Sequence, residues 1–133
     1  MAGNLSETVS GFFDVYNDDG HRWIDEVYGP EVKMVIPGAG VCTDDKESLH
    51  RAEDEFRRAV PDVRAELVAL HECNDGVAVI ECVLRWTDRA TGEASESWYC
   101  AICEFENEKI VSEVYYLDKS TFPAIDSVLA RLT

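Results

Sequence analysis

Apolar side chains near the start of the chain recur every three or four positions, which is the period of a helix. The segment from Leu5 to Tyr16 follows this spacing and predicts a first helix. Asn17-Asp18-Asp19-Gly20 interrupts it and supplies caps for a second, short helix, whose apolar residues lie between Trp23 and Tyr28. Gly29-Pro30 is predicted to end that helix, and a short strand at 32–36 to follow.

A third helix and a series of strands are predicted in the rest of the chain. Asp44 and Glu47 have the spacing of a capping box, and helical periodicity continues from there to about Val60. The period then changes to two, which indicates strands separated by turns. Ser120 or Thr121 can cap a last helix. The predicted strands are 63–72, 77–87, 95–106 and 109–118.

This order of elements predicts an α+β fold, because helices come first and antiparallel strands follow. A long, curved meander with helices on one side leaves a concave face. Such a face tends to become a pocket, since the helices can close one end and leave the other open. The length of 133 residues fits one domain, 1–133.

Composition and charge narrow the class of partner. Hydrophobic residues make up 46% of the chain, which is enough for a real core. Twelve Lys and Arg against 27 Asp and Glu give a formal net charge of −15. A surface this acidic repels nucleic acid and anionic membranes, so neither is expected as a partner.

The chain also carries no sign of membrane insertion or secretion. No stretch approaches the roughly 18 apolar residues of a membrane helix. The first twenty residues have neither the basic flank nor the apolar run of a signal peptide. The five cysteines, an odd number, suit free thiols better than a disulfide framework. A cytoplasmic location is therefore expected.

Three local motifs, in this order and spacing, resemble a known family. They are the aromatic-rich first helix ending in Asn17-Asp18-Asp19-Gly20, Val60-Pro61-Asp62 before the meander, and Glu108-Lys109-Ile110-Val111 leading to Tyr116-Leu117-Asp118. Together with the order of elements, they resemble the SnoaL-like polyketide cyclases of the nuclear transport factor 2-like superfamily. The resemblance implies a cone-shaped barrel: a curved antiparallel sheet packed on three N-terminal helices, with a short C-terminal helix. It also implies a homodimer formed through the outer face of the sheet.

The resemblance also narrows the chemistry. The ketosteroid isomerases of this superfamily have a catalytic aspartate and two oxyanion donors, at positions that fall at or near Ile36, Phe12 and Ala101 here. All three are apolar, which argues against steroid isomerisation. The limonene epoxide hydrolases share one aspartate, at Asp118, but their arginine falls at Val83. In the SnoaL-like cyclases, the aspartate at the end of the last long strand is the acid/base, and Asp118 stands at that place.

Asp118 is the main catalytic candidate. By period two it shares a strand face with Val114 and Tyr116. If that face points into the cone, the carboxylate lies against aromatic side chains, and desolvation raises its pKa toward the range useful for proton transfer. Tyr116 is then a substrate-binding candidate. The structural alternative is an aspartate that caps the following helix.

Glu81 and Arg85 share one face of the second meander strand, where buried charges are unusual. One interpretation is a carboxylate–guanidinium pair that holds Asp118 or a substrate oxygen, because the arginine fork suits carboxylates. The other is a solvent-facing or purely structural ion pair. Both interpretations remain open, and the sequence favours the second.

Four aromatic residues are candidates for lining the pocket or the core beneath it. These are Tyr16, Trp23, Phe56 and Tyr99. Aromatic side chains at helical spacing most often belong to a core, yet a phenol among them can also hydrogen-bond a ligand.

Neither a metal site nor a cofactor motif is apparent. His21, His50 and His71 are scattered, and no two have a metal-ligand spacing. Cys100 and Cys103 have a CxxC spacing, but strand residues three apart point to opposite faces, so two unrelated buried thiols are predicted. Cofactor-free chemistry is the consequence.

Two classes of function remain open. The first is an enzyme that binds a small hydrophobic molecule, such as a polyketide- or terpenoid-like intermediate, and moves a proton with Asp118. Cyclisation, isomerisation and epoxide opening all fit this equipment. The second is a non-catalytic protein of the same fold, either a small-molecule binder or a dimeric interaction module that uses the outer sheet face at Trp98, Cys100 and Ile102.

Overall fold

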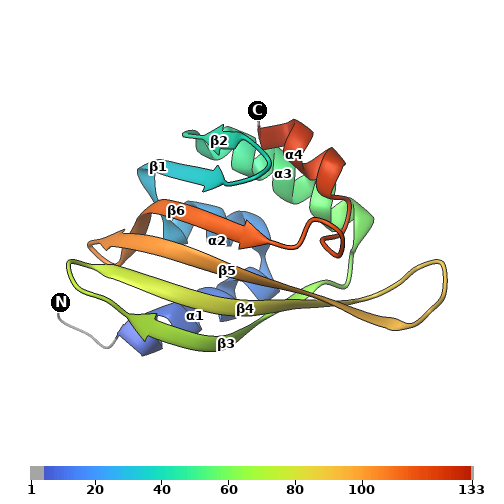
Figure 1. Cartoon of the computed structure of the whole chain (residues 1–133), viewed down its shortest axis with the longest axis horizontal. Coiled ribbons are helices and arrows are strands. Elements are labelled where there is room, and N and C mark those ends of the chain that lie inside the picture. The colour runs from blue at the N-terminus through green and yellow to red at the C-terminus, as the bar shows by residue number, and fades with distance from the viewer. Residues whose placement is uncertain (1–4, 133) are drawn as a thin grey trace.

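The computed structural model describes residues 5–132, apart from the side chains of residues 41 and 42. Within that range the chain forms four helices and six strands (Figure 1). In order they are α1 (Leu5–Asp18), α2 (Gly20–Val27), β1 (Tyr28–Ile36), β2 (Val41–Thr43), α3 (Lys46–Ala59), β3 (Arg64–Glu72), β4 (Val77–Thr87), β5 (Ala94–Glu106), β6 (Lys109–Leu117) and α4 (Ile125–Leu132). The α+β fold predicted from the sequence is confirmed.

The strands form one curved sheet in the order β2-β1-β6-β5-β4-β3. Neighbouring strands are antiparallel except for β1 and β6, which are parallel. The sheet does not close on itself, because β2 and β3 are its two edges. It is therefore an open, curved cone, and its four-strand meander is the one that the period-two pattern predicted.

The element boundaries differ from the predicted ones in two places near the N-terminus. The first strand begins at Tyr28, so Gly29-Pro30 lies inside β1 and does not separate α2 from it. The strand β2 was not predicted, and at three residues it is too short to show a period. Proline is tolerated in β1 because the pairing with β6 shifts register between Tyr28 and Lys33, where no ladder bond from residue 30 is needed.

The helix caps also differ by small shifts. Asp19 caps α2, accepting from the backbone N–H groups of His21 and Arg22, as the sequence indicated. The cap of α3 is Asp45, not Asp44, and its carboxylate accepts from the Ser48 N–H. The last helix begins at Ile125, several residues after the predicted caps, because residues 118–124 form turns.

Helices cover the concave face of the sheet and form the core with it. Figure 1 shows α1 and α2 behind the sheet, with α3 and α4 beside the β1–β2 end. Helix α1 contacts β3, α2 contacts α3 and β1, and α3 contacts α4. Alternate residues of β4 and β5 point inward, among them Ile80, Leu84 and Ala101, which are all buried. No helix within residues 5–132 is long and apolar enough to cross a membrane.

Candidate functional site

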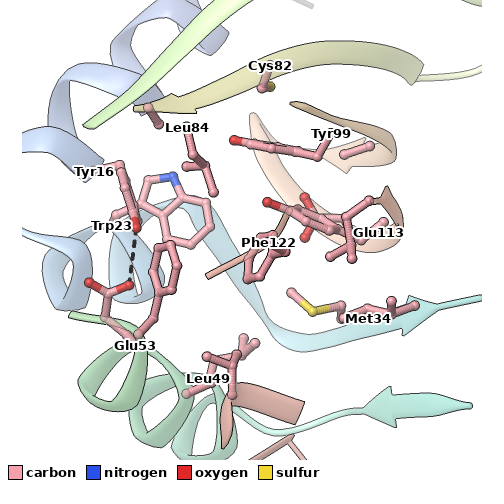
Figure 2. A pocket seen from close by; sticks show the side chains of 18 of the residues that line it. Tyr16, Trp23, Met34, Leu49, Glu53, Cys82, Leu84, Tyr99, Glu113 and Phe122 are labelled. Carbon is pink, nitrogen blue, oxygen red and sulfur yellow. Dashed lines mark hydrogen bonds between the residues drawn. The ribbon is translucent and has the colours of Figure 1, made fainter. Parts of the chain in front are cut away.

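A cavity of about 150 Å³ lies between the helices and the concave face of the sheet (Figure 2). A cavity of this size admits a benzene-sized molecule. Most of its wall is apolar, and eight aromatic side chains line it: Phe12, Phe13, Tyr16, Trp23, Phe56, Tyr99, Tyr115 and Phe122. The interior is therefore not packed solid, and it suits a small hydrophobic ligand.

Glu113 is one of two carboxyl groups in the cavity wall. It is 4% exposed and projects from the middle of β6. Its Oε1 accepts a hydrogen bond from the Tyr28 hydroxyl at 2.6 Å, and its Oε2 lies 3.5 Å from the Cys103 thiol. Desolvation raises the pKa of Glu113, and these hydrogen bonds only partly oppose the shift. No Lys or Arg is paired with Glu113 in the described part of the chain.

Glu53 is the second cavity carboxyl, and it is held by a cation. It lies on α3 and pairs with Arg57 one turn later, at 3.2 Å. The Tyr16 hydroxyl donates to Glu53 Oε1 at 3.4 Å, as the dashed line in Figure 2 marks. Burial raises the pKa of Glu53 and Arg57 opposes that shift. The two carboxyls therefore have different environments: Glu53 has a guanidinium partner, whereas Glu113 has only neutral donors.

Neutral hydrogen-bonding groups complete the polar part of the wall. The rings of Tyr99 and Tyr115 stack, with centroids 4.7 Å apart. Burial raises the pKa of both phenols well above the usual value, so both keep their protons and can donate. Burial also raises the pKa of the Cys82 thiol to about 12. Cys82 is therefore a thiol at neutral pH and a poor nucleophile.

The structure places Asp118 outside the cavity, so the prediction of a desolvated pocket carboxylate is wrong. Pairing between β5 and β6 points Glu113, Tyr115 and Leu117 toward the cavity, and the opposite set faces away. Asp118 follows the end of β6 and is exposed. Its Oδ1 accepts from the Ser120 N–H at 2.9 Å and the Ser120 hydroxyl at 2.6 Å, and these bonds lower its pKa. This geometry is that of a turn-capping aspartate.

The charged pair predicted on β4 is also on the outer face. Glu81 pairs with His71 at 2.6 Å, and Arg85 pairs with Glu66 and Glu96 at 3.2 and 2.7 Å. Neither lines the cavity, and neither contacts Asp118. The solvent-facing interpretation of Glu81 and Arg85 is therefore the correct one.

Tyr116 also lies on the outer face of the sheet. The other four aromatic residues predicted to bind a ligand lie in the cavity wall. Tyr116 is 48% exposed and does not reach the cavity, contrary to its prediction as a substrate-binding residue. Tyr16, Trp23, Phe56 and Tyr99 all line the cavity. Trp23 packs edge-on against Tyr16, at a centroid distance of 5.3 Å. A ligand-binding role for these four remains a prediction.

Sequence reasoning missed Glu113 and Glu53. A signal for Glu113 was present, because it is the only charged residue in the run from Ile110 to Leu117. A lone carboxyl in the middle of an otherwise uncharged strand indicates burial with a partner or a functional group. Glu53 gave a weaker signal, since it lies one turn after Leu49 at the edge of the apolar face of α3, and the rest of that helix is rich in charges.

The burial of the thiols and the placement of the histidines differ in part from the predictions. Cys100 and Cys103 lie on opposite faces of β5, but only Cys103 is buried, whereas Cys100 is half-buried on the outer face. In the described residues, no group of three or more His, Cys, Asp or Glu side chains converges on one point. His21 and His50, however, are in direct contact through their ring nitrogens.

The chain thus forms an open, curved sheet folded over helices around an apolar cavity. The family model described as a SnoaL-like domain matches residues 9–113. The chain therefore belongs to the SnoaL-like domain family, as the sequence motifs indicated. No curated protein sequence matches it.

Solved structures show the same fold at low sequence identity. Wild-type IdmH from Streptomyces antibioticus, a proposed polyketide cyclase, is 21% identical, with a TM-score of 0.78 over 98% of this chain and 99% of that one. A proposed SnoaL-like polyketide cyclase from Jannaschia sp. CCS1 is 12% identical, with a TM-score of 0.70 over 95% and 91%. A hypothetical protein with a ketosteroid isomerase-like fold from Catenulispora acidiphila DSM 44928, in complex with trimethylamine, is 13% identical, with a TM-score of 0.72 over 87% of this chain and 88% of that one.

Proposed function

We propose that the protein is a cofactor-independent enzyme that moves a proton on a small hydrophobic substrate, with Glu113 as the acid/base. One observation carries the proposal: a carboxyl group whose pKa is raised by burial lines an apolar, aromatic cavity. A raised pKa brings a carboxyl closer to neutral pH, where a general acid or base works best. Membership of the SnoaL-like family supports cyclisation or isomerisation as the reaction class.

The cavity wall supplies what such a reaction needs. Glu113, when protonated, donates a hydrogen bond or a proton to a substrate oxygen; when ionised, it accepts a proton from carbon. The phenols of Tyr99 and Tyr115 stay protonated and stabilise an oxyanion that forms beside them. The apolar wall excludes water, and this strengthens these interactions. Epoxide opening fits less well, because it requires a water held for attack in addition to the acid.

Hydrogen–deuterium exchange at the α-carbon of a small ketone tests the proposal without knowledge of the natural substrate. The probe is 2-indanone, a benzene ring fused to a five-membered cyclic ketone with acidic α-protons. Its exchange is followed by proton NMR in D₂O. Exchange above the buffer rate is expected from the wild-type protein, and Glu113→Gln is expected to reduce that excess by a factor of about 10²–10⁴. The matched control is Glu104→Gln, which removes an exposed carboxyl from the neighbouring strand.

A binding protein without catalysis is the alternative, and the hydrogen-bond partners of Glu113 favour it. Both oxygens of Glu113 already have a neighbouring donor, Tyr28 or Cys103, so the carboxyl has a structural use without any substrate. On this alternative, 2-indanone quenches the fluorescence of Trp23, which lines the cavity, but its exchange rate equals that of buffer. Quenching without exchange would therefore overturn the enzymatic proposal and retain the binding one.

We also propose a homodimer formed through the outer face of the sheet. Trp98 and Ile102 on β5 and Tyr116 on β6 lie on this face, and each is more than a third exposed. Large apolar side chains gathered on one sheet face are typical of a protein interface. A second copy of the same chain is the partner that the family resemblance implies. A cytoplasmic location also remains a prediction.

A further inference from the structure

Two histidines that lie 29 positions apart in the sequence meet between α2 and α3. His21 Nδ1 and His50 Nδ1 are 2.6 Å apart. The ring centroids are 4.9 Å apart, and the ring planes differ by 19°. The distance between the centroids equals the distance between the two nitrogens plus the distance from centroid to nitrogen in each ring. The two centroids and the two nitrogens therefore lie on one line. The two rings therefore meet edge to edge, nitrogen to nitrogen, in nearly one plane.

An aspartate lies behind each ring, at its other nitrogen. His21 Nε2 is 2.6 Å from Asp54 Oδ1, and His50 Nε2 is 2.9 Å from Asp25 Oδ1. An ionised carboxylate only accepts hydrogen bonds, so each Nε2 carries a proton. In a neutral imidazole the other nitrogen then has the lone pair. The two aspartates thus direct both Nδ1 lone pairs at the same point.

Two lone pairs that face each other at hydrogen-bond distance repel unless a cation lies between them. Among the described residues, no cationic side chain is bonded to either Nδ1 atom. Arg22 is engaged by Asp18 and Glu26, and Arg57 is engaged by Glu53. The side-chain amine of Lys46 donates to the backbone carbonyl of Asp25, not to its carboxylate. The charge around the pair is therefore mostly negative, and Asp19 adds to it as the cap of α2.

We propose that His21 and His50 form a binding site for a divalent transition-metal ion of the class that prefers imidazole, such as Zn²⁺. Histidines that bind a metal almost always donate their second ring N–H to a carboxylate or carbonyl, and both rings do so here. Zn²⁺, Ni²⁺ and Cu²⁺ are the ions that imidazole ligands suit. The two nitrogens supply two ligands, and water completes the coordination.

To admit the ion, the two rings must move apart and also turn away from their head-on alignment. Tetrahedral Zn²⁺ with nitrogen ligands at about 2.0–2.1 Å places two such ligands about 3.3 Å apart. The side chains of His21 and His50 are 43% and 29% exposed, so they can separate by this amount without disturbing the core. The same exposure leaves room for water ligands. A net charge of −15 attracts cations to the surface as a whole.

The site is also next to the cavity. Gly20, the residue before His21, packs against the carboxylate of Glu53. An ion bound by both histidines links α2 to α3 beside that cavity carboxyl. The binding proposal itself does not depend on the proposed enzymatic function.

Calorimetric titration of the untagged, reduced protein with Zn²⁺ at pH 7.5 tests the site. One ion per chain is expected for the wild type, with loss of binding in His21→Gln and in His50→Gln. Asp54→Asn keeps both ligands but removes the carboxylate behind one ring, so it is expected to weaken binding about 10–100-fold. The matched control is His71→Gln, because His71 is also backed by a carboxylate, Glu81, but has no second histidine. This variant is expected to bind as the wild type does.

Thermal unfolding provides a second test that does not depend on the heat of binding. Saturating Zn²⁺ is expected to raise the thermal midpoint of the wild type and of His71→Gln, and to leave that of His50→Gln unchanged. Three results would overturn the proposal: no saturable uptake by the wild type, unchanged uptake in both histidine variants, or uptake that disappears in Cys73→Ser. The first would mean that the pair shares only a proton. The last would assign the ion to the exposed thiol of Cys73.

Discussion

Tyr28 and Glu113, which lie 85 positions apart in the sequence, form a buried hydrogen bond of 2.6 Å between the phenol and the carboxyl group. Tyr28 is the first residue of β1, and Glu113 lies in the middle of β6, the strand that pairs with β1 in parallel. Tyr28 is fully buried, and burial raises its pKa well above the usual value. The phenol is therefore always a donor, and it holds the carboxyl oriented in the cavity wall.

Tyr28→Phe is expected to raise the pKa of Glu113 further. The hydrogen bond from Tyr28 lowers that pKa, so its removal leaves desolvation less opposed. The variant also leaves a buried acceptor without its donor, which typically costs about 1–3 kcal/mol of stability. The pH midpoint of 2-indanone exchange should therefore move to higher pH, and the urea midpoint should fall. An unchanged pH profile with a lower urea midpoint would mean that Glu113 does not control the reaction.

Glu113 should also make the stability of the protein depend on pH. Its pKa is raised in the folded state, from an ordinary value of 4.5. The folded protein thus holds this proton more tightly than the unfolded chain. The resulting stabilisation is complete below pH 4.5 and is lost as pH rises through the folded-state pKa.

Comparing Glu113→Gln with the wild type isolates this contribution. The variant cannot lose a proton, so its stability relative to the wild type should increase as pH rises above 4.5. Urea denaturation at a series of pH values measures the difference. The exposed control Glu104→Gln should show no such trend. A constant difference between Glu113→Gln and the wild type across that range would contradict the raised pKa.

Asp118→Asn is expected to keep most of the activity, in contrast to the sequence-based prediction. Its carboxylate is exposed and is bonded to Ser120 in the turn that leads to Phe122 and α4. Asparagine retains an oxygen that accepts from the same N–H, so the turn should persist. Exchange of 2-indanone should fall less than tenfold, against a hundredfold or more for Glu113→Gln. The reverse order of the two effects would restore Asp118 as the acid/base.

The error at Asp118 shows what period two can and cannot predict. The alternation of residues predicted a strand at the right place. A strand has two faces, however, and the pattern must also show which of them points toward the cavity. Tyr115, Tyr116 and Leu117 put apolar side chains on both faces of β6, so the sequence of this strand does not show which face is buried. Only the pairing with β5, in which Ala101 lies opposite Tyr115, fixes the inner set.

Other features of the site depend on contacts between distant segments. The aromatic residues of α1 and α2 were recognisable as pocket or core candidates, because their spacing shows which helix face is apolar. The bond from Tyr28 to Glu113 and the contact between His21 and His50 arise from how strands and helices pack. Spacing along the chain carries no information about either contact, whereas the family motifs sufficed to predict the fold.

Two glycine substitutions should have opposite effects on stability. A Cβ at Gly20 would overlap the carboxylate of Glu53, which Arg57 and Tyr16 hold in place. Gly20→Ala should therefore displace Glu53 and destabilise the protein by about 1–3 kcal/mol. Gly11 lies within α1 with nothing near its Cβ position, so Gly11→Ala should stabilise by about 0.5–1 kcal/mol. Thermal unfolding of both variants checks this. If both substitutions changed the stability equally, Glu53 would be shown to move aside without loss of free energy.

The outer sheet face provides the last prediction, because several of its large apolar side chains are exposed. Trp98 is 49% exposed, whereas its cross-strand partner Val83, on the outer face of β4, is fully buried. Such a face should associate with an identical face, since the apolar area of both copies leaves water.

Trp98→Glu places a charge in the middle of that face and should convert a dimer to a monomer in sedimentation velocity at micromolar concentration. Burying an unpaired carboxylate in an interface costs several kcal/mol, which exceeds what a modest interface provides. Ser127→Glu adds the same charge to an exposed position of α4 and should leave the dimer intact. If the wild type already sediments as a monomer, the face does not pair copies of this chain. If Ser127→Glu dissociates the dimer as well, the contact is made by helix α4 instead of the sheet.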